Sequence, residues 1–338
     1  MSLVGIFRRT VVEGRFVTFP VVLVILGMRL LLFLKCDVAD PSSTEVSHLW
    51  HFVAPFFYDG VISMVTATLA VLLIAWLIRS MNDRFALIRY RSNLIFIAPL
   101  LLLSLHPRFL VMTPDLVAVI FIQLAFFPLL ESYQKQDAYL HSFRSGVLIA
   151  IATLFHVGAL ALVPLWWRGE RSMRGPQLRA RLSYLFGFLL VGFSLFSLYF
   201  FLDDLPGFSQ PFHFYASISL PSLPVYTVVE WVALVLILLF FLSNMIMSTR
   251  VFSRDKVITL TLMRFVVYLI IFLWLLQALY WSRTLFFFTV ALTLISYLNA
   301  YFFTRTNSKS GVWLAYINLS VMLLFYLSHF TPFRLFNF

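Results

Sequence analysis

The sequence predicts an all-α fold, a polytopic bundle of transmembrane helices, on three observations. Of the 338 residues, 62% are hydrophobic and only 12% are charged, whereas globular domains are about 45–50% apolar and about 25% charged. Apolar runs of about 20 residues, the length that crosses a bilayer, recur along the chain. Most Lys and Arg residues lie between those runs. These features exclude a soluble enzyme, a disordered chain and a disulfide scaffold, the last because Cys36 is the single cysteine.

Nine apolar runs are candidates for full spans. We expect the first to be retained in the mature protein, because it is too long for a typical signal sequence and contains Arg29. The third and fourth runs are shorter than a bilayer requires. In chain order the nine runs are 16–34, 60–78, 94–105, 116–130, 182–202, 227–247, 258–280, 285–303 and 312–330.

A further run, 145–167, is long enough for one span, but the charges that flank it do not fit a single crossing of the membrane. Lys135 and Arg144 precede it and an arginine cluster at 168–181 follows it, so both flanks belong on the same side of the membrane. The simplest solution is a hairpin of two half-helices of about 11 residues each, turning near His156 and enclosing a cavity. A single span is the alternative, since loop charge is overridden at some positions.

The distribution of positive charge predicts the orientation of the chain. With a cytoplasmic N-terminus, 19 of the 25 Lys and Arg residues fall in cytoplasmic segments and only four fall outside, as the positive-inside rule requires. We therefore expect a multi-pass protein of the bacterial inner membrane. The net charge of +11 then reports orientation and does not indicate a nucleic-acid partner.

The first outer loop, 35–59, carries candidate catalytic acids. Asp37, Asp40 or Glu45 could act as a general base at the membrane surface. Residues 45–57 mix aromatic residues with histidines, a pattern typical of an amphipathic interfacial helix. The alternative is a solvated loop in which these acids have no chemical role.

Four further residues are candidates for binding a phosphate or a substrate. Arg108 suits phosphate because of its planar guanidinium, and Asp115 would orient a hydroxyl group or simply begin a helix after Pro114. Arg29 and His156 lie within apolar runs, where charged and polar residues are costly and often functional. Snorkelling explains Arg29 equally well. The adjacent acids Asp203 and Asp204 leave a divalent cation possible, but no metal-binding motif is present.

The middle of the chain reads TPDLVAVIFIQLAFFPLLE and then SGVLIAIATLFHVGALALVPLWWRGERS, followed by a basic loop and a span that ends in Asp203 and Asp204. This order resembles the core of polytopic GT-C glycosyltransferases, such as protein O-mannosyltransferases and aminoarabinose transferases. His156 stands roughly where that family has a lysine. The pattern is also similar to bacterial inner-membrane families of unassigned activity. We expect one integral membrane domain, 1–338, with a GT-C-like core at 94–204, the outer loop at 35–59 and C-terminal spans at 205–338.

The resemblance implies transfer of a sugar from a polyprenyl-phosphate donor to a cell-envelope acceptor on the outer face. Asp37 or Asp40 would be the base, and Arg29 or Arg108 would hold the donor phosphate. The partners would be the lipid bilayer and the lipid-linked sugar, without nucleic acid. The alternative is a non-catalytic subunit of an envelope assembly or a small-solute carrier.

Overall fold

The computed structural model describes residues 3–14, 18–35, 47–88, 92–135, 137–220, 242, 244–248, 255–281, 283–306 and 308–330. These residues form helices joined by turns, with no strand among them, so the predicted all-α fold is confirmed. A single isolated bridge joins Ser219 to Tyr280 in this part of the chain.

Seven described helices are long and apolar enough to cross a membrane. They are α2 (Thr18–Lys35), α4 (Gly60–Phe85), α6 (Pro114–Glu131), α9 (Leu178–Phe201), α12 (Val257–Leu279), α13 (Phe286–Arg305) and α14 (Lys309–Ser328). The run 94–105 yields only α5 (Leu94–Leu102), a helix of nine residues, which at about 1.5 Å per residue is too short to cross. The run 227–247 lies almost entirely outside the described residues. The described helices therefore give seven of the nine predicted spans.

The chain reverses in the segment predicted as a hairpin. Helix α7 (Tyr139–Phe155) ends at His156, and η4 (Val157–Ala161) leads into α8 (Leu162–Arg174). At the far ends, the Gln134 N–H donates to the Met173 carbonyl over 3.3 Å and the Arg174 guanidinium donates to the Ala138 carbonyl over 3.4 Å. A single straight helix would hold the ends of this run about 35 Å apart, so the two helices lie antiparallel.

The arms of this hairpin are longer than predicted. Helix α7 has 17 residues and α8 has 13, against the expected 11 or so, because both helices continue through their polar ends. The reason is local pairing: Glu170 and Arg174 form a buried ion pair of 2.7 Å, one turn apart on α8, and Arg174 also donates to the Ser142 hydroxyl of α7. The pair closes the open end of the hairpin.

The predicted interfacial helix is also shorter than its pattern suggested. Helix α3 (Trp50–Val53) continues as η2 (Ala54–Phe57), whereas the sequence pattern began at Glu45. Ser47 to Leu49 are not helical, because the Ser47 hydroxyl accepts the Trp50 N–H over 3.1 Å and starts the helix there. The Leu49 N–H bonds to the Leu154 carbonyl instead. Residues 36–46 lie outside the described residues.

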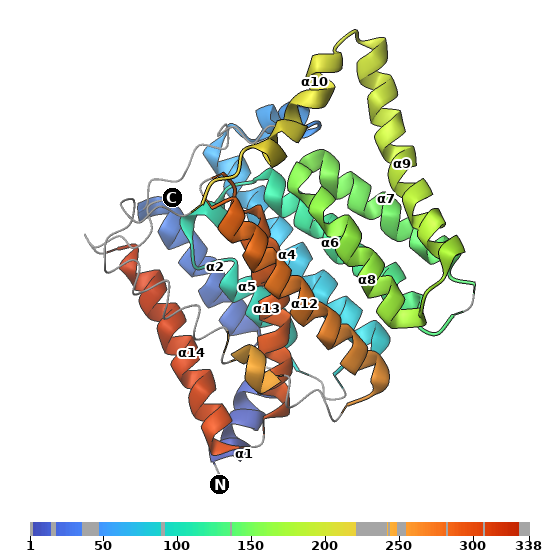
Figure 1. The fold of residues 1–338 in the computed structure, drawn as a ribbon. Helices are drawn as coiled ribbons and strands as arrows, with labels where there is room; N and C mark the ends of the chain where they lie inside the picture. Colours follow the sequence, from blue (N-terminus) through green and yellow to red (C-terminus); the bar gives the residue numbers. More distant parts are fainter. Residues whose placement is uncertain are drawn as a thin grey trace.

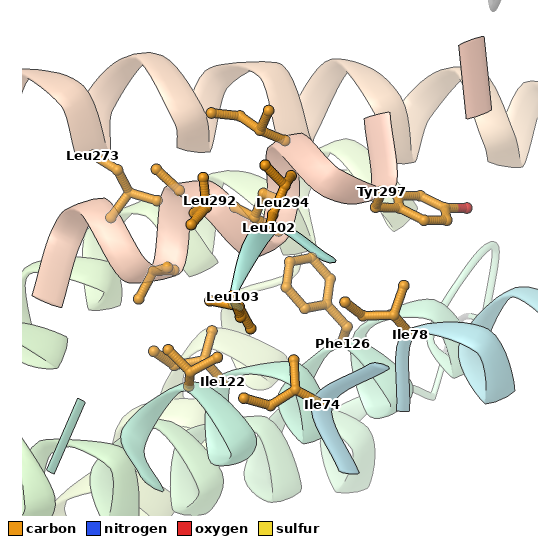
Figure 2. Close-up of a cluster of buried hydrophobic side chains, with 14 of the residues drawn as sticks. Ile74, Ile78, Leu102, Leu103, Ile122, Phe126, Leu273, Leu292, Leu294 and Tyr297 are labelled. Carbon is orange, nitrogen blue, oxygen red and sulfur yellow. The ribbon is translucent and has the colours of Figure 1, made fainter. Parts of the chain in front are cut away.

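Helix α13 forms the centre of the bundle. Its apolar stretch is 94% buried, against 17% for α2 and 22% for α9 and α14. Figure 2 shows part of the surrounding core, in which Ile74 and Ile78 of α4 and Phe126 of α6 lie across from Leu292 and Leu294 of α13. Helices α9 and α14 lie on opposite flanks (Figure 1). Exposed apolar faces of this size are typical of helices that contact lipid.

Hydrogen bonds place the basic loops together at one end of the bundle, which we call the basic end. Arg84, in the last turn of α4, pairs with Glu131 at the end of α6 over 2.5 Å. The Asn93 amide donates to the Gly14 carbonyl, and the Thr259 hydroxyl donates to the Leu87 carbonyl. Which end faces the cytoplasm stays a prediction from the charge distribution.

The first arm of the hairpin packs unusually close to α9. A Cβ atom at Gly146 of α7 would overlap the Tyr184 carbonyl oxygen, and one at Gly187 of α9 would lie 2.5 Å from the Phe143 carbonyl oxygen. Real Cβ atoms do not approach backbone so closely, and backbone cannot move aside as a flexible side chain can. Glycine at these two positions therefore sets the distance between α7 and α9.

We expect G146A and G187A each to lower the free energy of unfolding by about 1–3 kcal/mol, the usual cost of overpacking. G192A is the matched control, because a Cβ at Gly192, also on α9, meets nothing within 4 Å. That variant should be neutral or gain up to about 1 kcal/mol from helix propensity. Thermal unfolding of the three variants in one detergent measures the difference. Equal melting temperatures for all three would contradict the close packing.

Candidate functional site

Arg29 lies on α2, buried to 1% exposure, with its guanidinium directed at the segment after α5. Its Nη1 donates to the Leu103 carbonyl over 3.0 Å and its Nη2 to the Phe109 carbonyl over 2.7 Å. Its Nε donates to the Thr68 hydroxyl of α4 over 3.0 Å. Arg29 thus ties α2 and α4 to a stretch of backbone that is not regular helix.

That stretch needs such partners because it interrupts the bundle. Helix α5 stops at Leu102, and the chain continues through turns and the short 3-10 helix η3 (Pro107–Leu110) before α6 begins. Non-helical backbone inside a membrane bundle survives only where protein groups satisfy its donors and acceptors. Besides Arg29, the Ser63 hydroxyl of α4 accepts the Met112 N–H over 2.9 Å. Side chains from two helices therefore stabilise the interruption.

Three residues predicted from the sequence meet at this end of the bundle, away from the basic end. The Arg108 Nη2 lies 3.7 Å from Asp115 Oδ2, and the His156 Nε2 lies 3.6 Å from Asp115 Oδ1. We call Arg108, Asp115 and His156 the polar centre. The Asp115 and His156 side chains are only 3% and 4% exposed, whereas that of Arg108 is 29% exposed.

Local structure brings each member of the polar centre into position. Thr113 and Pro114 begin α6, so that Asp115 falls in the first turn, where the helix dipole favours a carboxylate. Arg108 belongs to η3, which begins where the His106 imidazole accepts the Arg108 N–H over 3.1 Å. His156 is extended backbone between α7 and η4.

The imidazole of His156 has its tautomer set by its neighbours. Its Nδ1 accepts the Gly158 N–H over 3.0 Å, so the ring proton sits on Nε2. Nε2 bonds to the Thr284 hydroxyl over 3.1 Å and lies 3.6 Å from Asp115 Oδ1. The ring also stacks on Phe286 with 4.2 Å between centroids. With both nitrogens engaged, His156 positions Asp115 and holds η4 against the start of α13.

The structure brings some of the predicted residues together, and the others lie outside the described residues. It joins Arg108, Asp115 and His156, and it places Arg29 beside them through η3, since Arg29 bonds to the residue next to Arg108. The candidate acids Asp37, Asp40 and Glu45 lie outside the described residues. Sequence reasoning missed Thr284, although a threonine just before a long apolar run is a typical helix start.

The described residues contain no group of three or more His, Cys, Asp or Glu side chains arranged to hold a metal ion. Of the adjacent acids at 203 and 204, Asp204 accepts the Gly207 N–H over 2.9 Å and caps α10 (Leu205–Ser209). A cavity of about 10 Å³ lies between α4, α6, α12 and α13, lined in part by Gln123, Thr293 and Tyr297. It has room for one water molecule at most, so it is too small for a substrate.

A second buried histidine lies close to the start of α3. His48 is 2% exposed and packs against Tyr199, Phe208 and Phe212. Its Nε2 lies 3.0 Å from the Phe208 carbonyl oxygen and donates to it. Burial lowers the pKa of His48, the Phe208 carbonyl opposes that shift, and the charge of nearby His51 adds to it. His48 joins the segment before α3 to the loop after α9.

Comparisons of this chain with family models, with curated proteins and with solved structures find no match. Its function is therefore argued from its residues.

Removing the Arg29 guanidinium should destabilise the protein strongly. R29M leaves the Leu103 and Phe109 carbonyls without their donor, and each unsatisfied buried group costs about 1–3 kcal/mol, so we expect a loss of about 2–5 kcal/mol. R29K should lose nearly as much, because an ammonium lacks the planar fork that reaches both carbonyls. T68V removes one hydrogen bond and should cost about 1 kcal/mol. Thermal unfolding of the series tests this order, and an R29M variant as stable as the wild type would refute it.

Acid should destabilise the packing around His48. Because the folded pKa of His48 is depressed, its contribution to stability is present above the unfolded pKa of about 6.5 and is lost as the pH falls toward the folded value. We expect the melting temperature to drop more between pH 7.5 and pH 5 in the wild type than in H48Q, whose amide can still donate to Phe208. H51Q changes the exposed neighbour and should keep most of the wild-type pH dependence. Identical profiles for the wild type and H48Q would count against this account.

Proposed function

We propose that this chain is a membrane-embedded glycosyltransferase of GT-C-like architecture, in which the polar centre binds the phosphate of a polyprenyl-phosphate-linked sugar. The observation that carries the proposal is the meeting of Arg108, Asp115 and His156 from three separate segments. A buried carboxylate and imidazole that orient a partly exposed arginine form an arrangement suited to an anion.

Arg108 is the member of the polar centre that can contact a ligand. Its side chain is 29% exposed, while Asp115 and His156 are nearly inaccessible. Arginine binds phosphate through charge-assisted, often bidentate hydrogen bonds. Asp115 and His156 are positioning residues in this proposal, since the His156 Nε2, which bonds to the Thr284 hydroxyl, lies 3.6 Å from Asp115, and Asp115 faces the Arg108 guanidinium.

Of the two arginines considered for the donor phosphate, we assign the role to Arg108. Arg29 is buried, and its Nε, Nη1 and Nη2 all donate to protein oxygens. A ligand at Arg29 would have to displace the bonds that hold the backbone after α5. Arg29 contributes to the site indirectly, because it fixes Phe109 and therefore η3.

The reaction itself requires a base and a leaving phosphate. The acceptor hydroxyl attacks the anomeric carbon of the sugar, the bond from that carbon to the phosphate oxygen breaks, and polyprenyl phosphate leaves with the bonding electrons. A carboxylate accepts the hydroxyl proton. Asp37 and Asp40 are the candidate bases, with Glu45 as a third. The donor dissolves in the bilayer, so a nucleotide-binding domain is not needed, and the active face would be the outer face of a bacterial inner membrane.

One observation favours the alternative, a non-catalytic membrane subunit or solute carrier. The contacts of His156 and Asp115 also hold three irregular segments together, as they would if these residues had only a structural role. The two functions differ in one consequence: a transferase accumulates its donor when it is removed, whereas a structural subunit leaves the donor unchanged.

Lipid-linked sugar profiling of a strain that lacks this protein, complemented by variants, tests the proposal. We expect the deletion strain to accumulate the donor, and the wild-type gene to return the donor to its normal level. R108Q should leave the donor accumulated, with transfer reduced at least about tenfold, since a lost charge-assisted hydrogen bond costs about 1.5–3 kcal/mol. R283Q is the matched control, because Arg283 is an exposed arginine next to Thr284. D37N/D40N should abolish transfer.

Three outcomes would remove parts of the proposal. An unchanged donor profile in the deletion strain removes transferase activity. Full restoration by R108Q removes the role of Arg108, and full restoration by D37N/D40N removes the assigned bases. Protein amounts in the membrane fraction must match between variants for these comparisons.

A further inference from the structure

One exposed stripe of α12 combines a charge with apolar residues. Arg264, Tyr268, Ile271 and Leu275 are all exposed, and their spacing of four, three and four residues places them on one face of the helix. The stripe begins toward the basic end with the arginine and continues as apolar surface. Helix α12 is one of the seven helices long enough to span the membrane.

Arg264 lies well inside this apolar helix. It is seven positions after Val257, the first residue of α12, which is about 10 Å along the axis. Among the described residues, no hydrogen bond or ion pair to its guanidinium is present. A charged side chain within a membrane helix is costly, and snorkelling toward the interface lowers that cost only in part. An anion beside Arg264 would offset it.

A second arginine from a neighbouring helix approaches the same place. The guanidinium carbon of Arg168 on α8 lies 4.4 Å from the centroid of the Tyr268 ring. Tyr268 is one turn from Arg264 on α12, so both arginines are neighbours of the same aromatic residue. Arg168 is exposed and, in the described part of the chain, is not paired with a carboxylate.

The acids on the surrounding elements are already used. Glu170, on α8, is buried and paired with Arg174. Asp255, just before α12, bonds to Tyr301 and Arg305 of α13. Neither carboxylate neutralises Arg168 or Arg264. The exposed surface around Tyr268 is therefore positively charged.

We propose that Arg168, Tyr268 and Arg264 form a binding site for the phosphate headgroup of an anionic phospholipid, with an acyl chain lying along Ile271 and Leu275. Two guanidinium groups supply charge-assisted donors to the phosphate, and basic pockets between membrane helices are typical places for such headgroups. A lipid fits better than a soluble anion, because the apolar stripe continues directly from the arginine. The site requires membrane embedding but not transferase activity.

Native mass spectrometry of the full chain in a neutral detergent tests the site. Phosphatidylglycerol and phosphatidylcholine with identical acyl chains are the probes. The wild type should retain phosphatidylglycerol at concentrations about tenfold or more below those needed for phosphatidylcholine, because each arginine contributes about 1 kcal/mol. R168Q/R264Q should lose this preference. R171Q/R179Q removes the same charge from exposed positions on α8 and α9 and should keep it.

Several results would overturn the proposal. These are no preference in the wild type, an unchanged preference in R168Q/R264Q, or an equal loss in R171Q/R179Q, which would mean general attraction to the basic end. Displacement of the lipid by millimolar inorganic phosphate would show that the site recognises a free anion. If R168Q/R264Q does not fold, R168K/R264K and Y268A replace it; the lysine pair should weaken the preference and Y268A should lower it several-fold, and wild-type binding in both variants would refute the site.

Discussion

The bonds from the Arg29 guanidinium to the Leu103 and Phe109 carbonyls are the interaction on which this end of the bundle depends. Backbone that leaves the helical conformation inside a membrane bundle has no water to satisfy it. The chain leaves that conformation after Leu102 and regains it at Pro114. Arg29 from α2 and Ser63 from α4 supply the missing partners. The same bonds place η3, and with it Arg108, so a structural requirement positions the residue that we assign to the donor phosphate.

A second interruption, at His156, meets the first. His156 ends α7, and its ring bonds to Gly158 and Thr284 while facing Asp115 at the start of α6. Each irregular segment is thus held by side chains from elsewhere in the chain. At the opposite end of the hairpin the Glu170–Arg174 pair holds α8 against α7. The hairpin is stable because hydrogen bonds and ion pairs hold both its turn and its open end.

Arginines in apolar helices of this protein are accommodated in two different ways. Arg29 is buried and surrounded by oxygen acceptors of its own chain. Arg264 is exposed on α12, one turn from Tyr268, where we propose a lipid phosphate as its partner. The first arrangement stabilises the fold from within the chain, whereas the second would require a partner from outside the chain.

The sequence by itself determined the all-α class, the positions of seven of the nine predicted spans and the reversal near His156, because apolar length and loop charge are local properties of the chain. It also singled out Arg29 and His156 as residues that are costly within apolar runs, and Arg108 and Asp115 as candidates for contacting a phosphate or a hydroxyl group. It could not decide that Arg29 bonds to backbone while Arg108, Asp115 and His156 meet, nor that Thr284 joins them. The end of α5 likewise depends on Arg29, which lies far away in the chain, and the open end of the hairpin depends on the bond from Arg174 of α8 to Ser142 of α7. Tertiary packing alone decides such points, since a hydrogen bond between distant segments leaves no periodic trace in the sequence.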